Sequence, residues 1–396
     1  MRDSELKQAF EEFLQRRPEE QKTAERETFD RLAGPWAEKL VVYGAGKLGQ
    51  KIVAGLRTMG AEPLALTDAN RILWGTYVAG LQVLPPPEAT TRFGSGATFV
   101  VAIWSPGEGR RLHDIRVHLG SLGCTSVISF VPLFWKHPDA FLPHYRIDLP
   151  HRILLARDQV DSVLNALADQ TSKEEFMRQV LWMASSEFGP LEGGIAGPAY
   201  FPADLFTLSQ NERLADCGAF DGDTVRVFNE RTGGTFQKVW AFEPDPMNLG
   251  KLEDYARRLH PAAREGLAIC PFALSDRRET LKFDALGTVG SGFSATGGLE
   301  VECLPLDEVF AGGPGPTLIK MDIEGAEPSA LVGASRTIRE YKPILAICVY
   351  HRQDHLWSIP TYVASLDLGY TLFLRRYGDE FGDVVFYAVP EHRLLA

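Results

Sequence analysis

The stretch RLADCGAFDGDT, residues 213–224, decides the fold. Its first residues form a short apolar run that ends in Asp216 and Cys217, and Gly218 and Gly222 follow within five positions. A short buried strand, a glycine turn and a helix are typical of the first unit of a doubly wound α/β sheet. Such a turn lets a ligand approach the backbone, and the helix N-terminus beyond it favours negative charge. We therefore expect a ligand site at this turn.

Apolar runs continue at regular intervals towards the C-terminus. They predict strands at 238–243, 267–273, 317–322 and 344–349, after the first at 213–217. Helices are expected at 246–259, 326–341 and 358–368. Two β-rich stretches close the chain within YTLFLRRYGDEFGDVVFYAVP (370–390) and predict a hairpin. This order predicts a doubly wound sheet with an antiparallel edge.

Polar residues stand where these strands end. Asp216 can accept from an ammonium group, and Glu243, 27 residues later, can accept from two ribose hydroxyls. In IKMDIEGAE (319–327), Lys320, Asp322 and Glu324 occupy alternate positions, which places them on one side of a strand end. Each feature alone also fits a tight turn or a surface ion pair, but their order on successive strands favours a cofactor site. A ligand with both an amino and a carboxylate group, such as S-adenosylmethionine, suits this turn better than a pyrophosphate.

The motifs DCGAFDGDT, AFEPDP, ALSD and IKMDIEGAE, in this order, resemble those of the FkbM-type family of class I S-adenosylmethionine-dependent methyltransferases. The resemblance covers about residues 205–390 and implies O-methylation, since the family's members are generally O-methyltransferases, several of them acting on sugars or polyketide products. It implies that Asp216, Gly218 and Gly222 hold the methionine part of the cofactor, that Glu243 holds the ribose, and that Asp322 lies near the transferred methyl group. The sequence departs from many relatives at Phe220-Asp221. The predicted cofactor-binding set is Asp216, Gly218, Asp221, Gly222, Thr224, Glu243, Ala273 and Asp322.

Methyl transfer to a hydroxyl requires in-line alignment and removal of the hydroxyl proton. We expect Asp322 or His351 to accept this proton, and we assign Lys320 and Glu324 to the same catalytic group. A polar residue at a strand end is an equally good interpretation of His351. An Asp/Glu/His metal site that uses Asp322 or Glu324 is compatible with the sequence, but the spacing does not require one, and we assign no metal.

The N-terminal half has its own glycine motif, GAGKLG (44–49), after the apolar run 40–43. With Asp68, it fits a dinucleotide fingerprint at Gly44, Gly46 and Gly49. The continuation TDANRILWGTYVAGLQVLPP (67–86) instead resembles the nucleotide-sugar-binding domain of PglD-type sugar acyltransferases, over about 40–130. This resemblance implies a nucleotide-sugar partner and favours a carbohydrate or related small-molecule or glycan acceptor. A glycine turn that binds nothing is an equally good interpretation.

Two alternatives to a methyltransferase remain open. One is an NAD(P)-dependent oxidoreductase centred on the N-terminal half, although no convincing acid/base set for hydride transfer follows GAGKLG. The other is a non-catalytic nucleotide-binding protein that keeps the methyltransferase fold, although Asp216, Glu243 and Asp322 are all present.

Length and composition set the frame. The 396 residues favour two Rossmann-like domains, which we expect as a helical arm (1–36), a nucleotide-binding-type domain (37–150), a helical linker (151–204) and a methyltransferase domain (205–396). In the linker, Ser172 and Glu175 have capping-box spacing. The net charge of −11 argues against a general nucleic-acid binder. With no membrane-length apolar run, no signal-peptide pattern and five scattered cysteines, we expect a cytoplasmic protein without disulfides.

Overall fold

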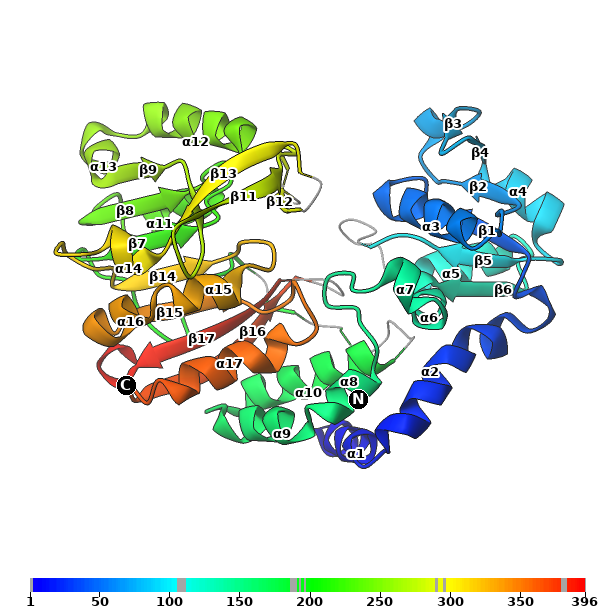
Figure 1. The fold of residues 1–396 in the computed structure, drawn as a ribbon, viewed down its shortest axis with the longest axis horizontal. Helices are drawn as coiled ribbons and strands as arrows, with labels where there is room; N and C mark the ends of the chain where they lie inside the picture. Colours follow the sequence, from blue (N-terminus) through cyan, green and yellow to red (C-terminus); the bar gives the residue numbers. More distant parts are fainter. Residues whose placement is uncertain are drawn as a thin grey trace. The chain divides into compact units, whose positions relative to one another are not determined.

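The computed structural model describes residues 3–104, 112–185, 191, 194–195, 197–288, 291–294, 297–378 and 383–395. The chain forms two compact units, each with its own parallel sheet (Figure 1). The first comprises residues 1–160, 176–194 and 378–382, and the second comprises 161–175, 195–377 and 383–396. The expected linker 151–204 is therefore divided between the two units.

The first unit is built on a six-stranded sheet in the order β3-β4-β2-β1-β5-β6. Its strands are β1 (Leu40–Tyr43), β2 (Ala65–Thr67), β3 (Tyr77–Val78), β4 (Leu81–Leu84), β5 (Thr98–Val101) and β6 (Ser126–Ser129). All neighbouring pairs are parallel except β3 and β4. Its helices are α1 (Asp3–Leu14), α2 (Pro18–Ala33), α3 (Lys47–Thr58), α4 (Pro86–Phe93), α5 (Leu112–Ser121), α6 (Phe130–Lys136), α7 (Pro138–Phe141) and α8 (His151–Leu155). Two further helices, α9 (Arg157–Ala166) and α10 (Gln170–Ala184), each cross the division between the units.

The second unit is built on a seven-stranded sheet in the order β16-β17-β15-β14-β7-β8-β9. Its strands are β7 (Arg213–Cys217), β8 (Lys238–Phe242), β9 (Leu267–Cys270), β14 (Leu318–Met321), β15 (Ile344–Cys348), β16 (Tyr370–Tyr377) and β17 (Asp383–Pro390). The strands from β15 to β9 are parallel, and the hairpin β16–β17 adds an antiparallel edge. The predicted α/β fold with a terminal hairpin is confirmed.

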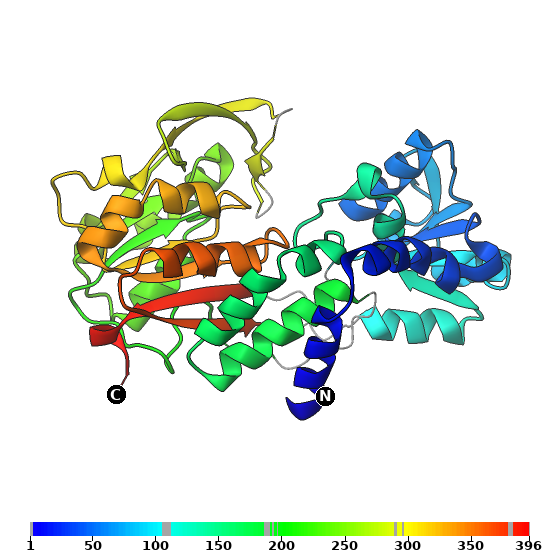
Figure 2. The same ribbon diagram turned by 60° about the horizontal axis from the view of Figure 1, so that its bottom comes forward.

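Helices cover both faces of this sheet (Figures 1 and 2). On one face, α11 (Asp223–Arg231) and α12 (Pro246–Arg258) bury Val225, Phe228, Leu252 and Tyr255 against the strands. The opposite face carries α15 (Glu327–Val332), α16 (Ser335–Tyr341) and α17 (His355–Ser365). Burial of a side chain such as Leu252 or Phe228 contributes about 1.5–3 kcal/mol, so these contacts hold the two helices on the sheet.

A second sheet interrupts the predicted strand 267–273. The strand β9 ends at Cys270, and β10 (Ala273–Leu274) joins β11 (Glu279–Asp284), β12 (Gly292–Phe293) and β13 (Leu299–Leu304) in a separate four-stranded sheet. Pro271 lies between the two strands and has no N–H for the ladder, which accounts for the break. The prediction of one continuous strand was wrong. The short helices α13 (Pro261–Gly266) and α14 (Leu306–Val309) complete the unit.

The predicted helix 326–341 is also two helices, α15 and α16. The backbone carbonyl of Gly333 accepts from Asp307 N at 2.9 Å instead of continuing the helix. The Asp307 carboxylate then accepts from the backbone N–H groups of Arg336 and Thr337 at the start of α16. Gly333 itself has no room for a side chain, since a Cβ would lie 2.1 Å from the Ser275 carbonyl oxygen.

The cap of α10 also differs from the prediction. Asp169, not Ser172, accepts from the backbone at the start of this helix, because its Oδ1 accepts from Ser172 N at 2.7 Å. The Ser172 hydroxyl instead accepts from Leu374 N at 2.9 Å and from the Arg375 guanidinium at 2.8 Å. Ser172 therefore joins the helix to β16.

The structure also bears on membrane-spanning helices and on the cysteines. Among the described residues, no helix combines the length and the apolar character needed to cross a membrane. All five cysteines are free thiols.

Candidate active site

The second sheet reverses its strand order between β7 and β14. From β7 the chain adds β8 and β9 on one side, then returns to add β14 and β15 on the other. Ligands of doubly wound sheets bind at the carboxyl ends of the strands at such a switch point. Asp216 near the end of β7 pairs in register with Ala241 of β8 and Lys320 of β14. Asp216 and Lys320 therefore meet at the position where the topology favours a ligand.

Asp216 and Lys320 form a buried ion pair at the switch point. Lys320 Nζ lies 3.0 Å from Asp216 Oδ1 and donates to the Gly218 carbonyl oxygen at 2.6 Å. Burial raises the pKa of Asp216 to about 6, although Lys320 opposes this shift. Burial disfavours the charged form of Lys320, but nearby carboxylates, Asp216 first, raise its pKa above the usual value. Apart from this contact with Lys320, the carboxylate oxygens of Asp216 have no partner among the described residues, so Oδ2 retains capacity for a ligand cation.

The glycine turn needs its two glycines for steric reasons. Gly218 and Gly222 both have φ near +87°, a region that L-residues rarely adopt. A Cβ on Gly218 would lie 1.9 Å from the Asp322 carbonyl oxygen, and one on Gly222 would lie 2.8 Å from the Tyr255 ring. The turn therefore packs directly on the loop that carries Asp322.

The other predicted residues of this segment, Asp221 and Thr224, lie just before and in the first turn of α11. Thr224 is buried, and its backbone N–H donates to Asp223 Oδ1 at 2.6 Å. Asp221 is partly buried and lies 4.0 Å from the Arg226 guanidinium. Asp221, in the turn before α11, therefore has a long contact with a cation of that helix.

Glu243 follows β8 directly and is 5% exposed. Its Oε2 accepts from Phe220 N at 2.8 Å and its Oε1 from Asp245 N at 2.9 Å. Burial raises the pKa of Glu243 to about 7, although these two N–H groups favour the carboxylate. Each carboxylate oxygen still has a lone pair, so Glu243 can accept two further hydrogen bonds.

Asp322 lies just past β14 and is the centre of a polar cluster. Its Oδ2 accepts from the Tyr200 hydroxyl at 2.7 Å and its Oδ1 from the Tyr350 hydroxyl at 3.0 Å. His351 Nε2 lies 3.2 Å from the same Oδ1. Burial opposes ionisation, but His351 and Lys320 hold the pKa of Asp322 well below its usual range. The carboxylate is therefore ionised at neutral pH.

His351 is nearly fully buried between carboxylates. Its Nδ1 lies 2.8 Å from Glu327 Oε1, and its Nε2 faces Asp322 and, at 3.8 Å, Glu324 Oε1. Burial opposes protonation of His351, but Glu327 and Asp322 raise its pKa well above 6.5. Glu324 has φ +54°, and burial raises its pKa to about 7. His351 thus joins Asp322 to the buried Glu327, and its role in catalysis stays a prediction.

The structure brings together some predicted residues and separates others. Lys320 reaches Asp216, whereas Glu324 faces His351, because the chain leaves the strand geometry after Met321. The expected one-sided alternation therefore does not extend to Glu324. Ala273 lies in β10 of the four-stranded sheet, outside the seven-stranded sheet.

Three residues of the cluster were missed from the sequence: Tyr200, Glu327 and Tyr350. Tyr200 precedes β7 in an irregular segment, which gives no periodic signal. Glu327 is the last residue of IKMDIEGAE and is fully buried. Glu327 and the apolar Leu331 are four residues apart, which places them on the same face of a helix. This spacing was the available signal that Glu327 is buried and needs partners.

The N-terminal motif lies at the carboxyl edge of the first unit's sheet. Ala45 N donates to Asp68 Oδ2 at 2.7 Å, and Asn70 N donates to its Oδ1 at 2.7 Å, so Asp68 closes the turn. A Cβ on Gly49 would lie 1.8 Å from the Gly44 carbonyl oxygen, whereas a Cβ on Gly46 meets nothing within 4 Å. Gly49 is required for packing, and the space beside Gly46 is open. The nucleotide-sugar interpretation stays a prediction.

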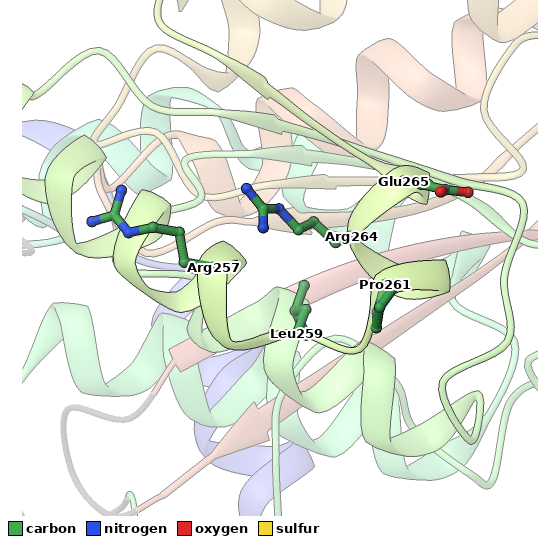
Figure 3. A pocket seen from close by; sticks show the side chains of 5 residues that line it. All are labelled: Arg257, Leu259, Pro261, Arg264 and Glu265. Carbon is green, nitrogen blue, oxygen red and sulfur yellow. The ribbon is translucent and has the colours of Figure 1, made fainter.

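One surface pocket lies away from this edge (Figure 3). It is lined by Arg257, Leu259, Pro261, Arg264 and Glu265. These residues directly precede β9, so the pocket lies at the amino ends of the strands, opposite the candidate site. In the close-up, Glu265 points away from the two arginines.

Comparisons with known proteins bear on this geometry. The family model of the Methyltransferase FkbM domain matches residues 216–381. The crystal structure of Methyltransferase FkbM from Methylobacillus flagellatus KT is 24% identical, with a TM-score of 0.74, and the match covers 92% of each chain. At this identity the likeness shows a shared fold. No curated protein matches the chain.

Weaker structural matches were also found. Aeropyrum pernix fibrillarin in complex with natively bound S-adenosyl-L-methionine is 13% identical, with a TM-score of 0.30 over 46% of this chain and 69% of that one. UDP-D-quinovosamine 4-dehydrogenase from Vibrio fischeri is 25% identical, with a TM-score of 0.21 over 23% of this chain and 76% of that one. Both TM-scores are low, and neither likeness bears on function.

Proposed function

Since the family model of the Methyltransferase FkbM domain matches residues 216–381, we propose that the protein transfers the methyl group of S-adenosylmethionine to a hydroxyl oxygen. The acceptor in this proposal is a carbohydrate or a related small molecule or glycan. The protein acts in the cytoplasm in this proposal. The observation that carries the proposal is the arrangement of Asp216, Glu243 and Asp322 at the carboxyl ends of three neighbouring strands around the switch point.

The residues at this edge fit the parts of S-adenosylmethionine. The buried Asp216 carboxylate suits an ammonium group, and the turn around Gly218 and Gly222 leads to the N-terminus of α11, which suits a carboxylate. Glu243 has free lone pairs for two ribose hydroxyls. When bound, S-adenosylmethionine supplies an electrophilic methyl group on a sulfonium.

Asp322 accepts the acceptor's proton in this proposal. The hydroxyl oxygen forms a bond to the methyl carbon while the carbon–sulfur bond breaks, and the electron pair of that bond goes to sulfur. The oxygen becomes strongly acidic as the new bond forms, so even a weakly basic carboxylate can take its proton. His351 already carries a proton at neutral pH because of its raised pKa, which makes it a positioning group for Asp322.

The test is a calorimetric titration of the full chain with S-adenosylhomocysteine, NADH and UDP-sugars in parallel. The proposal predicts binding of S-adenosylhomocysteine that is lost in Asp216→Ala. Binding of NADH with oxidation of an alcohol would favour an oxidoreductase instead. Binding of UDP-sugars without S-adenosylhomocysteine would favour a non-catalytic nucleotide-binding protein.

A further inference from the structure

Glu327, the first residue of α15, is a fully buried carboxylate that closes the turn after Asp322. Its Oε1 accepts from Ile323 N at 2.9 Å and from Gly325 N at 3.4 Å. Glu324 and Gly325 have φ +54° and +100°, so two successive residues of this turn lie in the left-handed region. A residue such as Glu324 keeps this conformation only where its surroundings fix it. Glu327 therefore helps to fix the backbone that directly follows Asp322.

The same carboxylate contacts two buried imidazole rings. Its Oε1 lies 2.8 Å from His351 Nδ1, and its Oε2 lies 3.4 Å from His355 Nδ1. Burial opposes ionisation of Glu327, but His351 and, to a smaller extent, His355 lower its pKa to about 2. Glu327 is therefore ionised at neutral pH and has no proton to donate to either ring.

The buried His351 ring has a carboxylate at each of its nitrogens. Nδ1 faces Glu327, and Nε2 lies 3.2 Å from Asp322 Oδ1. An ionised carboxylate can only accept a hydrogen bond, so both ring nitrogens must donate, and a ring with two N–H groups is the imidazolium cation. Glu324 Oε1, at 3.8 Å from Nε2, and the Tyr350 ring, with centroids 4.3 Å apart, also face His351. The imidazolium has no lone pair with which to take a proton from an acceptor.

We propose that Glu327 is a positioning residue for methyl transfer. It holds His351 as an oriented imidazolium and thereby leaves Asp322 as the group that takes the acceptor's proton. This role rests on the proposed function and selects one of the two proton acceptors that the sequence leaves open. Because Glu327 is fully buried, it acts through His351 and through the turn, without contact with the acceptor.

The charge of Glu327 matters most after the proton has moved. Before the step, the imidazolium lies between two ionised carboxylates, Asp322 and Glu327. Once Asp322 has taken the proton it is neutral, and without Glu327 the buried cation would have only Glu324, at 3.8 Å, as a carboxylate neighbour. A buried charge that loses its partner is strongly destabilised. Glu327 stays ionised throughout and keeps His351 paired on both sides of the proton transfer.

The experiment is a nuclear magnetic resonance pH titration of the full chain with isotope-labelled histidine. The signal of His351 is identified by its loss in His351→Gln. We expect wild-type His351 to keep both ring protons through pH 6.5, where a free imidazole ring titrates. Glu327→Gln should lower the pKa of His351 towards 6.5, because it removes one of the two carboxylates at the ring. Glu327→Asp, which keeps the charge, should restore most of the raised pKa.

Glu212→Gln provides the matched control. Glu212 is as buried as Glu327 and accepts from Ser209 N at 3.0 Å, but it lies at the amino end of β7, opposite the candidate site. Both variants should melt below the wild type, and only Glu327→Gln should change the pKa of His351. With a panel of sugar acceptors, Glu327→Gln should lower the release of S-adenosylhomocysteine by up to about 100-fold, the cost of a misplaced reacting group. Its affinity for S-adenosylhomocysteine should match that of the wild type.

A wild-type His351 that titrates near pH 6.5 would overturn this role without the need for any variant. An unchanged His351 pKa in folded Glu327→Gln would overturn it too, as would wild-type turnover in that variant. If the wild type binds S-adenosylhomocysteine and one of these results is found, the proposed function stands and the role of Glu327 alone is refuted. Absence of S-adenosylhomocysteine binding to the wild type would contradict the proposed function and this role with it.

Discussion

Replacement of Glu243 by glutamine tests the ribose assignment with little damage to the fold. Alanine would leave the backbone N–H groups of Phe220 and Asp245 without acceptors, at a cost of about 1–3 kcal/mol for each buried group. Glutamine keeps the shape and one acceptor oxygen, but its NH2 group faces one of the two backbone N–H groups, so the free energy of unfolding is measured beside the affinity to separate this cost from the loss of charge. A hydrogen bond to a charged group contributes about 1.5–3 kcal/mol, which corresponds to about 10–150-fold in the dissociation constant of S-adenosylhomocysteine.

The raised pKa of Glu243 adds a pH dependence with a defined sign. Its folded-state pKa of about 7 lies above the usual 4.5, so its contribution to fold stability is full below about pH 4.5 and is lost as the pH rises through about 7. Ligand hydroxyls favour the carboxylate, so affinity should change in the opposite direction. The ionised fraction rises from about one tenth at pH 6 to about nine tenths at pH 8, which predicts an approximately tenfold gain in affinity.

Neighbouring charges set the size of this effect. Asp245 raises the pKa of Glu243 and Lys320 lowers it. Asp216 has a pKa of about 6, so its ionisation adds only about a twofold gain in ligand affinity between pH 6 and pH 8. Calorimetric titrations at both pH values, with the wild type and Glu243→Gln, measure the two contributions. An equal pH dependence in the wild type and the variant would refute the ribose assignment, as would unchanged affinity in folded Glu243→Gln.

Three further predictions follow from the contacts. Asp322→Asn should stay folded, with a lowered thermal melting temperature because His351 and Lys320 lose a carboxylate, and should lower methyl transfer to a panel of sugar hydroxyls, measured as S-adenosylhomocysteine release, by about 100-fold or more; near wild-type release would exclude Asp322 as the proton acceptor. Gly46→Val should melt like the wild type but lose UDP-sugar binding, whereas Gly49→Ala should be destabilised by about 1–3 kcal/mol because its Cβ meets the Gly44 carbonyl; UDP-sugar binding by folded Gly46→Val would contradict a site at this turn, and no UDP-sugar binding by the wild type would remove the nucleotide-sugar interpretation. Ser172→Ala should lower the free energy of unfolding by about 1–3 kcal/mol, since it leaves buried Leu374 N without its acceptor, and an unchanged urea midpoint would contradict this reasoning.

The strand–helix alternation of the second sheet could be predicted from the sequence because buried parallel strands are continuous apolar runs bounded by turn residues. β7, β8, β14 and β15 each agree with the expected strand to within one residue at either end. Asp216, Glu243 and Asp322 could be placed at one edge for the same reason, since parallel strands share their carboxyl end.

What the sequence could not predict depends on contacts between distant segments. Tyr200 reaches Asp322 across 122 positions, and no local pattern marks such a pairing. The break after β9 was missed because the apolar residues on both sides of Pro271 fit a strand, and the proline alone marks its end. The cap of α10 was misassigned because Asp169 and Ser172 are both good capping residues, and the demand of Leu374 N for an acceptor decided between them.

The central claim is that S-adenosylmethionine binds at the carboxyl edge of β7 and β8. A crystal structure of the full chain with S-adenosylhomocysteine tests it most directly. We predict the ribose hydroxyls within hydrogen-bond distance of Glu243, the amino group at Asp216, and the sulfur facing Asp322. S-adenosylhomocysteine bound at the GAGKLG turn of the first unit, or at the pocket beside Arg257, with this edge empty would contradict the claim.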